Sequence, residues 1–385
     1  MQSFEFATAS QIIFGSNKLA DVGSIVSPLG QRAFIVIGAS TLRAQPLFDY
    51  LKAENISYTT FNVVGEPTIE TARLGLRQAR QFQTDIVIGL GGGAVIDTGK
   101  AIASLLTNQG DILDYLEVVG QGQPLVNPSL PYIAIPTTAG TGAEVTRNAV
   151  LGVPEERVKV SLRSPMMLPT VALVDPDLTH SMPPPITATT GLDALTQLIE
   201  PYVSPYATPL TDSFCLEGIN LVARSLRTAY RDGDDWAARE DMALASLLGG
   251  LALANAKLGV VHGIAGPFGG MFEGPHGAIC AALLPDAMAI NIQALQDRLP
   301  ESDSLYRYLE IAQLLTGNIE ATAEDGVTWV KALCQSLNIA PLSAYGLQED
   351  TFPELIKKSQ RSSSMKGNPI ELTEKEIQEI LRQAL

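Results

Sequence analysis

The segment 85–106 constrains the fold more than any other part of the chain. Residues 85–89 are an apolar run typical of a buried parallel strand, and residues 94–106 have the apolar periodicity of a helix. A glycine-rich turn, Gly89-Leu-Gly-Gly-Gly93, joins them. A strand, a glycine turn and a helix in this order direct backbone N–H groups toward a phosphate. The turn is not G-x-G-x-x-G and lacks the ending of an NTPase loop, so a tight turn without a ligand is the alternative.

Strand-like and helix-like segments alternate through the first half of the chain. Apolar runs predict strands at 33–37, 58–63, 85–89, 132–136 and 171–174, with helices at 47–55, 68–82 and 94–106. This βαβ rhythm predicts a mainly parallel sheet covered by helices on both faces. Ligands of such sheets lie beyond the carboxyl ends of the strands. Gly38, the turn at 89–93 and the loop 137–142 all fall there.

The character of the sequence changes near Met182-Pro-Pro-Pro185. Beyond it, helical spacing rich in Ala and Leu dominates at 187–202, 208–230, 236–256 and 278–295. With 385 residues, the chain is long enough for two domains of ordinary size. We therefore expect a Rossmann-like α/β nucleotide-binding domain over residues 1–180 and an all-α domain over residues 181–385.

Composition excludes several classes of partner. Hydrophobic residues make up 46% of the chain and charged residues 17%, which argues for a large core and against disorder. The net charge of −15 argues against nucleic acid and against an anionic membrane surface. The most apolar run, 242–256, is shorter than the roughly 20 residues that span a bilayer, so we expect a buried core helix. Three scattered cysteines fit neither disulfides nor a zinc cluster, and no secretory signal is visible, so we expect a cytoplasmic protein.

A small set of polar residues carries the chemistry of the second half. Asp193 and Gln197 are four residues apart and share one helical face. The chain has three histidines, and two of them, His262 and His276, lie in one stretch rich in glycine and proline. One carboxylate, one amide oxygen and two imidazoles could hold a divalent metal. The alternative is that both histidines only pack or cap helices, and spacing alone leaves the two interpretations open.

Several motifs in register resemble one known family. They are Gly91–Lys100 (Gly-Gly-Gly-Ala-Val-Ile-Asp-Thr-Gly-Lys), Ile135–Thr146, Gly191–Thr196, His262–Gly270, Pro275–Gly277 and Ser364–Ile370. Together they are similar to the iron-containing (group III) alcohol dehydrogenases of the dehydroquinate synthase-like superfamily, over essentially the whole chain. The resemblance implies an N-terminal NAD(P)-binding domain, a helical metal- and substrate-binding domain, and an active site in the cleft between them.

The resemblance also implies the residues that bind the cofactor. It assigns the pyrophosphate to Gly92, Gly93 and Ala94, cofactor contacts to Thr137, Thr138 and Thr141, and the ribose region to Asp97 and Lys159. The plainer alternatives are a simple turn at the threonines, a helix cap at Asp97 and a surface lysine at 159. Family members that favour NAD often have an aspartate after the first strand. This chain has Gly38, Ser40 and Thr41 there, so we expect NADP to be accepted, with NAD as the alternative.

Two residues depart from the family pattern. Gln197 stands where the family has a metal-binding histidine, and Gly266 stands where it often has a histidine of the proton relay. A neutral amide binds iron or zinc more weakly than an imidazole does. We therefore expect a weakened Fe or Zn site at Asp193, Gln197, His262 and His276, and a metal-free site is the alternative.

The function implied by the resemblance is an NAD(P)-dependent alcohol dehydrogenase or aldehyde reductase. Asp193, His262 and His276 would be catalytic through the metal, and the substrate would be a small alcohol or aldehyde. The alternatives are an NAD-using carbon–oxygen lyase of the dehydroquinate synthase type, a maleylacetate reductase, and a nucleotide-binding protein without catalysis. The family also implies a homo-oligomer, a dimer or larger.

Overall fold

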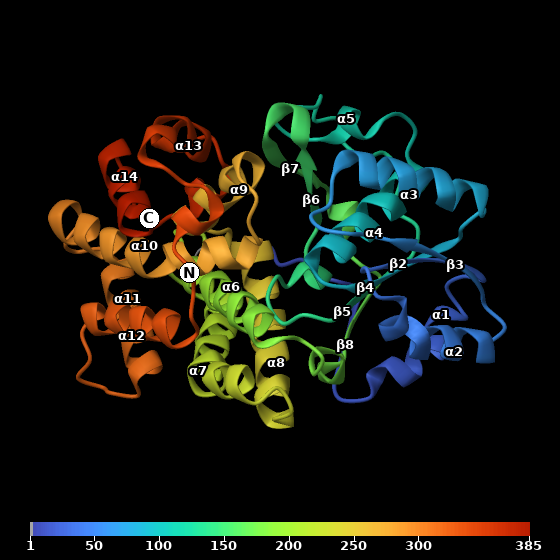
Figure 1. The fold of residues 1–385 in the computed structure, drawn as a ribbon, viewed down its shortest axis with the longest axis horizontal. Coiled ribbons are helices and arrows are strands. Elements are labelled where there is room, and N and C mark those ends of the chain that lie inside the picture. Colours follow the sequence, from blue (N-terminus) through green and yellow to red (C-terminus); the bar gives the residue numbers. More distant parts are fainter. Residues whose placement is uncertain (1–2) are drawn as a thin grey trace. The chain divides into compact units, whose positions relative to one another are not determined.

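The computed structural model describes residues 3–385, which form two compact units. The α/β unit contains Ala7–Thr138 and Gly142–His180. The helical unit contains Ser181–Leu385, the short segment Ala139–Thr141 and the residues up to Phe6. Figure 1 shows the two units in the blue-to-green and the green-to-red parts of the chain.

A parallel sheet forms the centre of the α/β unit. Within residues 3–385 it has six strands, in the order β1-β8-β5-β4-β2-β3, and every neighbouring pair is parallel. The strands are β1 (Gln11–Phe14), β2 (Arg32–Ile37), β3 (Ser57–Asn62), β4 (Ile86–Gly91), β5 (Tyr132–Pro136) and β8 (Val171–Val174). This confirms the predicted fold class of a mainly parallel sheet followed by a helical region.

Helices cover both faces of this sheet (Figure 1). On one face, α1 (Val22–Val26) and α2 (Gln45–Ala53) pack against side chains such as Ile35 and Ile88. On the other face, α3 (Ile69–Gln81) and α4 (Gly93–Thr107) pack against side chains such as Phe34 and Val87. Successive side chains of each strand point to opposite faces of the sheet, so each strand contributes apolar residues to both cores. The predicted strands and helices of this half are confirmed to within a few residues.

The strand order creates a switch point between β2 and β4. The chain leaves β2 through α2 on one face, and it leaves the neighbouring β4 through α4 on the opposite face. The loops after these two strands therefore diverge at the carboxyl edge of the sheet. Open α/β sheets bind their ligands at such a point. Gly38 and the glycine turn, which the sequence singled out, both lie there.

Three strands were missing from the sequence prediction. β6 (Asn148–Val153) and β7 (Val158–Arg163) form an antiparallel hairpin outside the main sheet. Their turn is the charged segment Pro154-Glu-Glu-Arg157, in which Arg157 adopts a φ of 51°. Because alternate residues of β6 are only partly buried, the hairpin lacks the continuous apolar run that marks the central strands. β1 is a four-residue edge strand with partly exposed side chains.

Helices build the second unit. They are α6 (Pro184–Val203), α7 (Pro209–Arg231), α8 (Trp236–Ala256), α9 (Val260–Met271), α10 (His276–Arg298), α11 (Asp303–Thr316), α12 (Ala323–Ser336), α13 (Phe352–Ser359) and α14 (Glu374–Gln383). The sequence predicted α6, α7, α8 and α10 but not α9, whose five Gly and Pro residues argue against a helix. Burial of its apolar face overrides this weak propensity.

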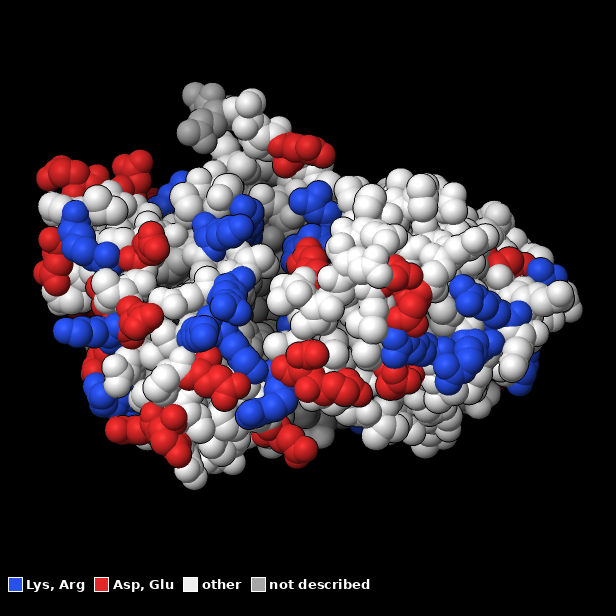
Figure 2. Space-filling view, turned by 90° about the horizontal axis from the view of Figure 1, so that it is seen from above, with Lys and Arg blue, Asp and Glu red and all other residues white. Residues whose placement is uncertain are grey.

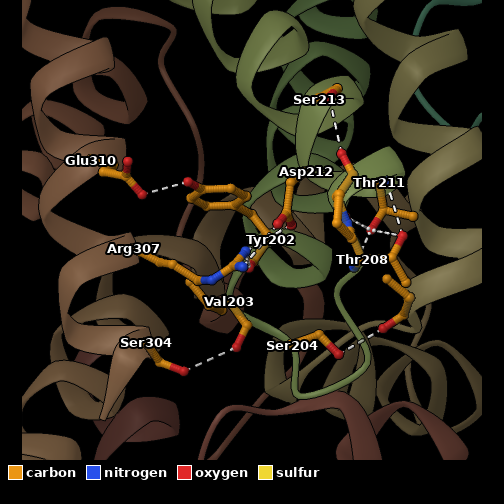
Figure 3. A network of polar contacts seen from close by, with 12 residues as sticks. Tyr202, Val203, Ser204, Thr208, Thr211, Asp212, Ser213, Ser304, Arg307 and Glu310 are labelled. Carbon is orange, nitrogen blue, oxygen red and sulfur yellow. Dashed lines mark hydrogen bonds and ion pairs between the residues drawn. The ribbon is translucent and has the colours of Figure 1, made fainter. Parts of the chain in front are cut away.

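A polar network holds the end of α6 against its neighbours (Figure 3). The guanidinium of Arg307, on α11, donates to both carboxylate oxygens of Asp212, at 2.7 and 2.8 Å, and to the carbonyl of Tyr202. The Tyr202 hydroxyl in turn donates to Glu310, at 2.5 Å. This network ties α6, α7 and α11 together, and α6 carries the residues of the site described below.

One helix has the length and apolarity of a membrane span. It is α10, and 78% of its most apolar window is buried inside the protein. A pair, α8 with α9, passes the same test, but these helices bend by 97° at their junction. Helix α8 contains the run 242–256 that the sequence predicted as a core helix, and its apolar side chains lie in the main core of the helical unit.

Candidate active site

Four side chains from three helices converge in the helical unit. Asp193 comes from α6, His262 from α9, and His276 and Cys280 from α10. One ligand atom of each lies within 4.8 Å of the others. Nε2 of His262 is 3.4 Å from Oδ1 of Asp193, and Nε2 of His276 is 3.9 Å from the same oxygen. We call these residues the four-residue cluster; three were predicted as metal-site residues and Cys280 was not.

A glycine allows α10 to approach α6 closely at this point. A Cβ on Gly277 would lie 2.6 Å from the carbonyl oxygen of Thr189 and 3.4 Å from the Cβ of Asp193. The first of these contacts is backbone, which cannot yield as the tip of a side chain can. Gly277 therefore lets His276, its neighbour at the start of α10, stand within reach of Asp193.

Two buried oxygens at the cluster lack a donor. Within residues 3–385, neither Oδ1 of Asp193 nor Oε1 of Gln197 receives a hydrogen bond, although these side chains are only 1% and 3% exposed. An unpaired buried oxygen costs roughly 1–3 kcal/mol. Carboxylate, imidazole and thiolate are all common ligands of divalent transition metals. The donor set and the unpaired oxygens therefore fit a bound divalent cation.

Glu200 fixes the orientation of His262. Its Oε2 accepts a hydrogen bond from Nδ1 of His262 at 2.7 Å, and its Oε1 accepts one from the backbone N–H of Val261 at the same distance. Because Nδ1 carries the proton toward Glu200, the lone pair of Nε2 is left for the cluster. A carboxylate behind a metal-binding imidazole is the usual way to set its tautomer and raise its basicity.

The charges of the cluster shift the pKa values of its members. Burial raises the pKa of Asp193, but the His262 and His276 imidazoles outweigh it and hold that pKa below its ordinary value. Burial lowers the pKa of His262, while its neighbours Cys280, Glu200 and Asp193 more than offset this and raise it well above the usual range. An imidazole of this site therefore readily takes up a proton at Nε2, and a bound metal would displace that proton and use the lone pair.

Two members of this site were missed in the sequence, and both carry a spacing that could have found them. Cys280 lies four residues after His276, and Glu200 lies seven residues after Asp193, so each pair shares a helical face. The sequence analysis placed no cysteine at this site, whereas the structure brings Cys280 into a group of side chains that could hold a metal ion. All three cysteines lie in the described part and are free.

The predicted phosphate turn sits at the carboxyl edge of the sheet. Strand β4 ends at Gly91 and α4 begins at Gly93, so the first-turn N–H groups of α4 follow directly. A Cβ on Gly92 would lie 3.4 Å from Thr138, which follows the neighbouring β5. The N–H of Thr137 donates to the carbonyl of Gly91 at 3.0 Å. Gly92, Gly93, Ala94, Thr137 and Thr138 therefore lie around one turn.

The loop after β2 is open. Ser40 and Thr41 are exposed, and no described atom lies within 4 Å of where a Cβ of Gly38 would stand. The carbonyl of Gly38 accepts a hydrogen bond from Asn62. Thr141 belongs to the segment Ala139–Thr141, which is part of the helical unit, whereas Thr137 and Thr138 belong to the α/β unit.

Asp97 and Lys159 both have protein partners. Oδ2 of Asp97 accepts the N–H of Val150 at 2.9 Å, and Oδ1 lies 3.4 Å from Nζ of Lys100. The ammonium of Lys100 is fully buried, and it donates to the carbonyls of Ala143 and Asn148 and to the hydroxyl of Thr146. These three bonds measure 2.8, 2.7 and 2.9 Å. Lys159 pairs with Glu66 at 3.1 Å, and its side chain is 9% exposed rather than free in solvent.

Comparison with known families agrees with this geometry. Residues 9–176 match the family described as iron-containing alcohol dehydrogenase. Residues 187–385 match the C-terminal family of Fe-containing alcohol dehydrogenases. The two matches together cover most of the chain and meet near the boundary between the two units.

Individual proteins are similar along their whole length. The 1,3-propanediol dehydrogenase of Klebsiella pneumoniae is 35% identical, over 99% of this chain and 98% of that protein. The lactaldehyde reductase of Escherichia coli is 33% identical over 92% of each chain. Among solved structures, 1,3-propanediol oxidoreductase superimposes with a TM-score of 0.91 over both complete chains, at 35% identity. A sulfoacetaldehyde reductase of Bifidobacterium kashiwanohense, solved with NAD+, gives 0.86 at 27% identity, over 99% of this chain and 98% of that one.

Proposed function

This chain belongs to the iron-containing alcohol dehydrogenase family, and from that premise we propose a specific reaction. It is reversible hydride transfer between NADP(H) and a small alcohol or its aldehyde, with NAD(H) accepted less well. The single observation that carries the proposal is the convergence of Asp193, His262 and His276 on one buried point in a chain with three histidines. Short hydroxyaldehydes are the first substrates to test, given the relatives named above.

Each proposed residue has a distinct role. The N–H groups at Gly92, Gly93 and Ala94 bind the pyrophosphate, and Thr137, Thr138 and Thr141 contact the cofactor. Asp97 and Lys159 lie at the ribose. A bound nicotinamide would supply the hydride chemistry, and a bound divalent metal would supply Lewis acidity. Asp193, His262 and His276 would hold that metal, with Gln197 beside them and Glu200 orienting His262.

Position 266 is a glycine and so offers no side chain that could donate the proton of the reaction. Gly266 lies on α9, and within the described chain no atom stands within 4 Å of where its Cβ would be. We infer that water or a ribose hydroxyl supplies the proton there. The cytoplasm and a homo-oligomer are the compartment and assembly that we propose. The runner-up reaction, carbon–oxygen elimination, leaves the total amount of oxidised cofactor unchanged.

Cofactor oxidation tests the proposal directly. Purified protein with zinc or iron, NADPH and a panel of short aldehydes should show loss of reduced nicotinamide matched by alcohol formation. The Asp193→Asn variant removes the anionic ligand and should lower kcat/KM by at least about 100-fold. Folded wild-type protein that is silent with every cofactor and metal contradicts the proposal. Product formation without net NADPH loss selects the lyase instead.

The cofactor preference has its own test. Ala39→Asp places a carboxylate in the open loop after β2, where a 2′-phosphate would lie. Repulsion between this carboxylate and the 2′-phosphate should raise the KM for NADP about tenfold. The KM for NAD, which lacks this phosphate, should be nearly unchanged. Leu42→Asp, which adds the same charge at a side chain 81% exposed, is the control. Equal effects of the two variants on both cofactors contradict the predicted NADP site.

A further inference from the structure

We propose that Cys280 is a ligand of the metal site. Asp193, His262, His276 and Cys280 then form a set of one oxygen, two nitrogen and one sulfur donor, which favours zinc over iron. The inference rests on the proposed function only in taking the same cluster as metal-binding. It is independent of which alcohol reacts and of which nicotinamide cofactor is used.

The distances within the cluster approach those of a tetrahedral metal site, and all four ligand atoms lie within 4.8 Å of one another. With zinc bonds of about 2.0 Å to oxygen and nitrogen and about 2.3 Å to sulfur, tetrahedral ligand atoms stand about 3.4 Å apart for N and O and about 3.6 Å apart for N and S. In the structure, Nε2 of His262 is 3.4 Å from Asp193 Oδ1. Sγ of Cys280 is 3.7 Å from Nε2 of His276 and 3.9 Å from Nε2 of His262. Small movements would therefore bring the four atoms to bonding distance of one ion.

Helix α10 places the Cys280 side chain at the four-residue cluster. His276 and Cys280 are four residues apart on α10, so both side chains project from one face of the helix. Cys280 has no exposed surface. Its sulfur contacts the ring nitrogens of both histidines, and each of these nitrogens also faces Asp193. The thiol thus shares its surroundings with three metal-binding groups rather than with apolar side chains alone.

Cys280 also compensates for the metal-binding histidine that Gln197 replaces. The amide of Gln197 is neutral, and its buried Oε1 has no hydrogen-bond partner within the described residues. A thiolate is a far stronger donor to zinc than an amide oxygen. Binding of the metal releases the thiol proton, so the sulfur contributes a full negative charge. The cluster therefore keeps four donors although one expected imidazole is replaced.

The other two cysteines differ from Cys280 in their surroundings. Burial raises the pKa of the Cys215 thiol, which lies in the apolar core of the helical unit. The Cys334 thiol donates to the carbonyl of Ala281 at 3.5 Å, and burial raises its pKa to about 12. Neither belongs to the four-residue cluster. They can therefore be replaced by serine without removing a proposed ligand.

Cobalt(II) substitution gives a readout that does not depend on catalysis. Cobalt bound by a thiolate shows a sulfur-to-metal charge-transfer band in the near ultraviolet, while its visible bands report binding by any ligand. We expect both kinds of band in the full-length wild-type protein and in the Cys215→Ser/Cys334→Ser double variant, whose sole remaining cysteine is Cys280. In Cys280→Ser the charge-transfer band should be lost. In Gln197→Ala it should remain at full intensity.

The outcomes separate this inference from the proposed function. Visible cobalt bands without the charge-transfer band in the double variant overturn the inference, and so does a failure of the folded wild-type protein to bind cobalt. If the protein reduces aldehydes but its cobalt form lacks the charge-transfer band, the proposed function stands and only the sulfur ligand is ruled out. The band without any NADPH-dependent turnover supports the ligand set and counts against the function. A competition between zinc and iron(II) should favour zinc in the wild type, and this preference should fall in Cys280→Ser.

Discussion

The two ring nitrogens of His262 face different partners. Nδ1 lies 2.7 Å from Glu200 and Nε2 lies 3.4 Å from Asp193. The Glu200 carboxylate therefore sets the tautomer of His262, and the Asp193 carboxylate lies in the cluster beside the lone pair of Nε2. A residue that fixes its neighbour in this way contributes to binding although it does not contact the metal itself.

Glu200→Gln tests this arrangement. The amide can still accept from Nδ1, but it no longer offers a negative charge to the imidazole. Zinc affinity, measured by competition with a chromophoric chelator, should fall about 10- to 100-fold. Glu310→Gln is the control, because Glu310 lies on α11 and hydrogen-bonds Tyr202 instead. Unchanged zinc affinity in Glu200→Gln would show that the hydrogen bond does not serve the metal.

Glu144 predicts a pH dependence of stability in the α/β unit. Its side chain is 2% exposed, and burial raises its pKa from 4.5 to about 7, despite the backbone and Lys100 acting in the opposite direction. A carboxyl whose pKa is higher in the folded state stabilises the fold while it is protonated. That stabilisation is complete below about pH 4.5 and is lost as the pH rises through about 7.

The Glu144→Gln variant isolates this effect, since a neutral amide does not titrate. Between pH 4.5 and 8, the free energy of unfolding of the wild type should fall relative to the variant by up to about 3 kcal/mol. Urea unfolding at several pH values measures the difference. Glu156→Gln, at an exposed position of the hairpin turn, should show no such trend. A difference that grows toward low pH would mean that the sign is wrong.

At the scale of elements, the site depends on how closely α6 and α10 approach each other. Gly277→Ala places a methyl group 2.6 Å from the Thr189 carbonyl, so α10 must move away from α6. We expect a loss of roughly 1–3 kcal/mol in stability from overpacking. Zinc affinity should fall at least about tenfold, because His276 moves with the helix.

The matched control is Gly266→Ala. It makes the same exchange inside a neighbouring helix, where the new methyl group would meet no described atom within 4 Å. It therefore shares the gain in helix propensity, about 1 kcal/mol, without the clash. Thermal unfolding and zinc titration compare the two variants. Similar behaviour of both would show that the contact at Gly277 does not position His276.

The elements also show what the sequence could predict. Continuous apolar runs such as residues 33–37 found the central strands, because both faces of those strands are buried. Helix α9 was missed because glycine and Pro267 conceal it, and only tertiary packing makes it a helix. Cys280 was missed for a related reason. Its spacing from His276 gains meaning once α10 begins at His276, and its approach to Asp193 depends on the contact of α10 with α6.

At the scale of the whole molecule, the chain carries an excess of acidic residues, which one face displays together with basic ones (Figure 2). The net charge is −15, and on the face shown in Figure 2 the acidic and basic side chains are intermingled. A polyanion would need a continuous basic area. The expectation of a small-molecule substrate, with phosphate recognised locally by backbone groups, stays a prediction.

The cluster draws all its side chains from the helical unit, so metal removal should act on that unit first. At a zinc concentration 100 times Kd, binding stabilises the unit by about 2.7 kcal/mol. Adding a chelator should lower the protection of α6, α9 and α10 amides against hydrogen exchange by that amount. Protection of α4 should be unchanged. An equal loss of protection in α4 contradicts this prediction.

The enclosure of Lys100 has a practical consequence. Its amine is held by Ala143, Thr146 and Asn148 and has almost no accessible surface, so acylating reagents reach it only after β6 and the loop before it detach from α4. The rate of acylation at Lys100, followed by mass spectrometry, would therefore measure how often the α/β unit opens. A dinucleotide that slows the acylation would reveal its binding without any turnover.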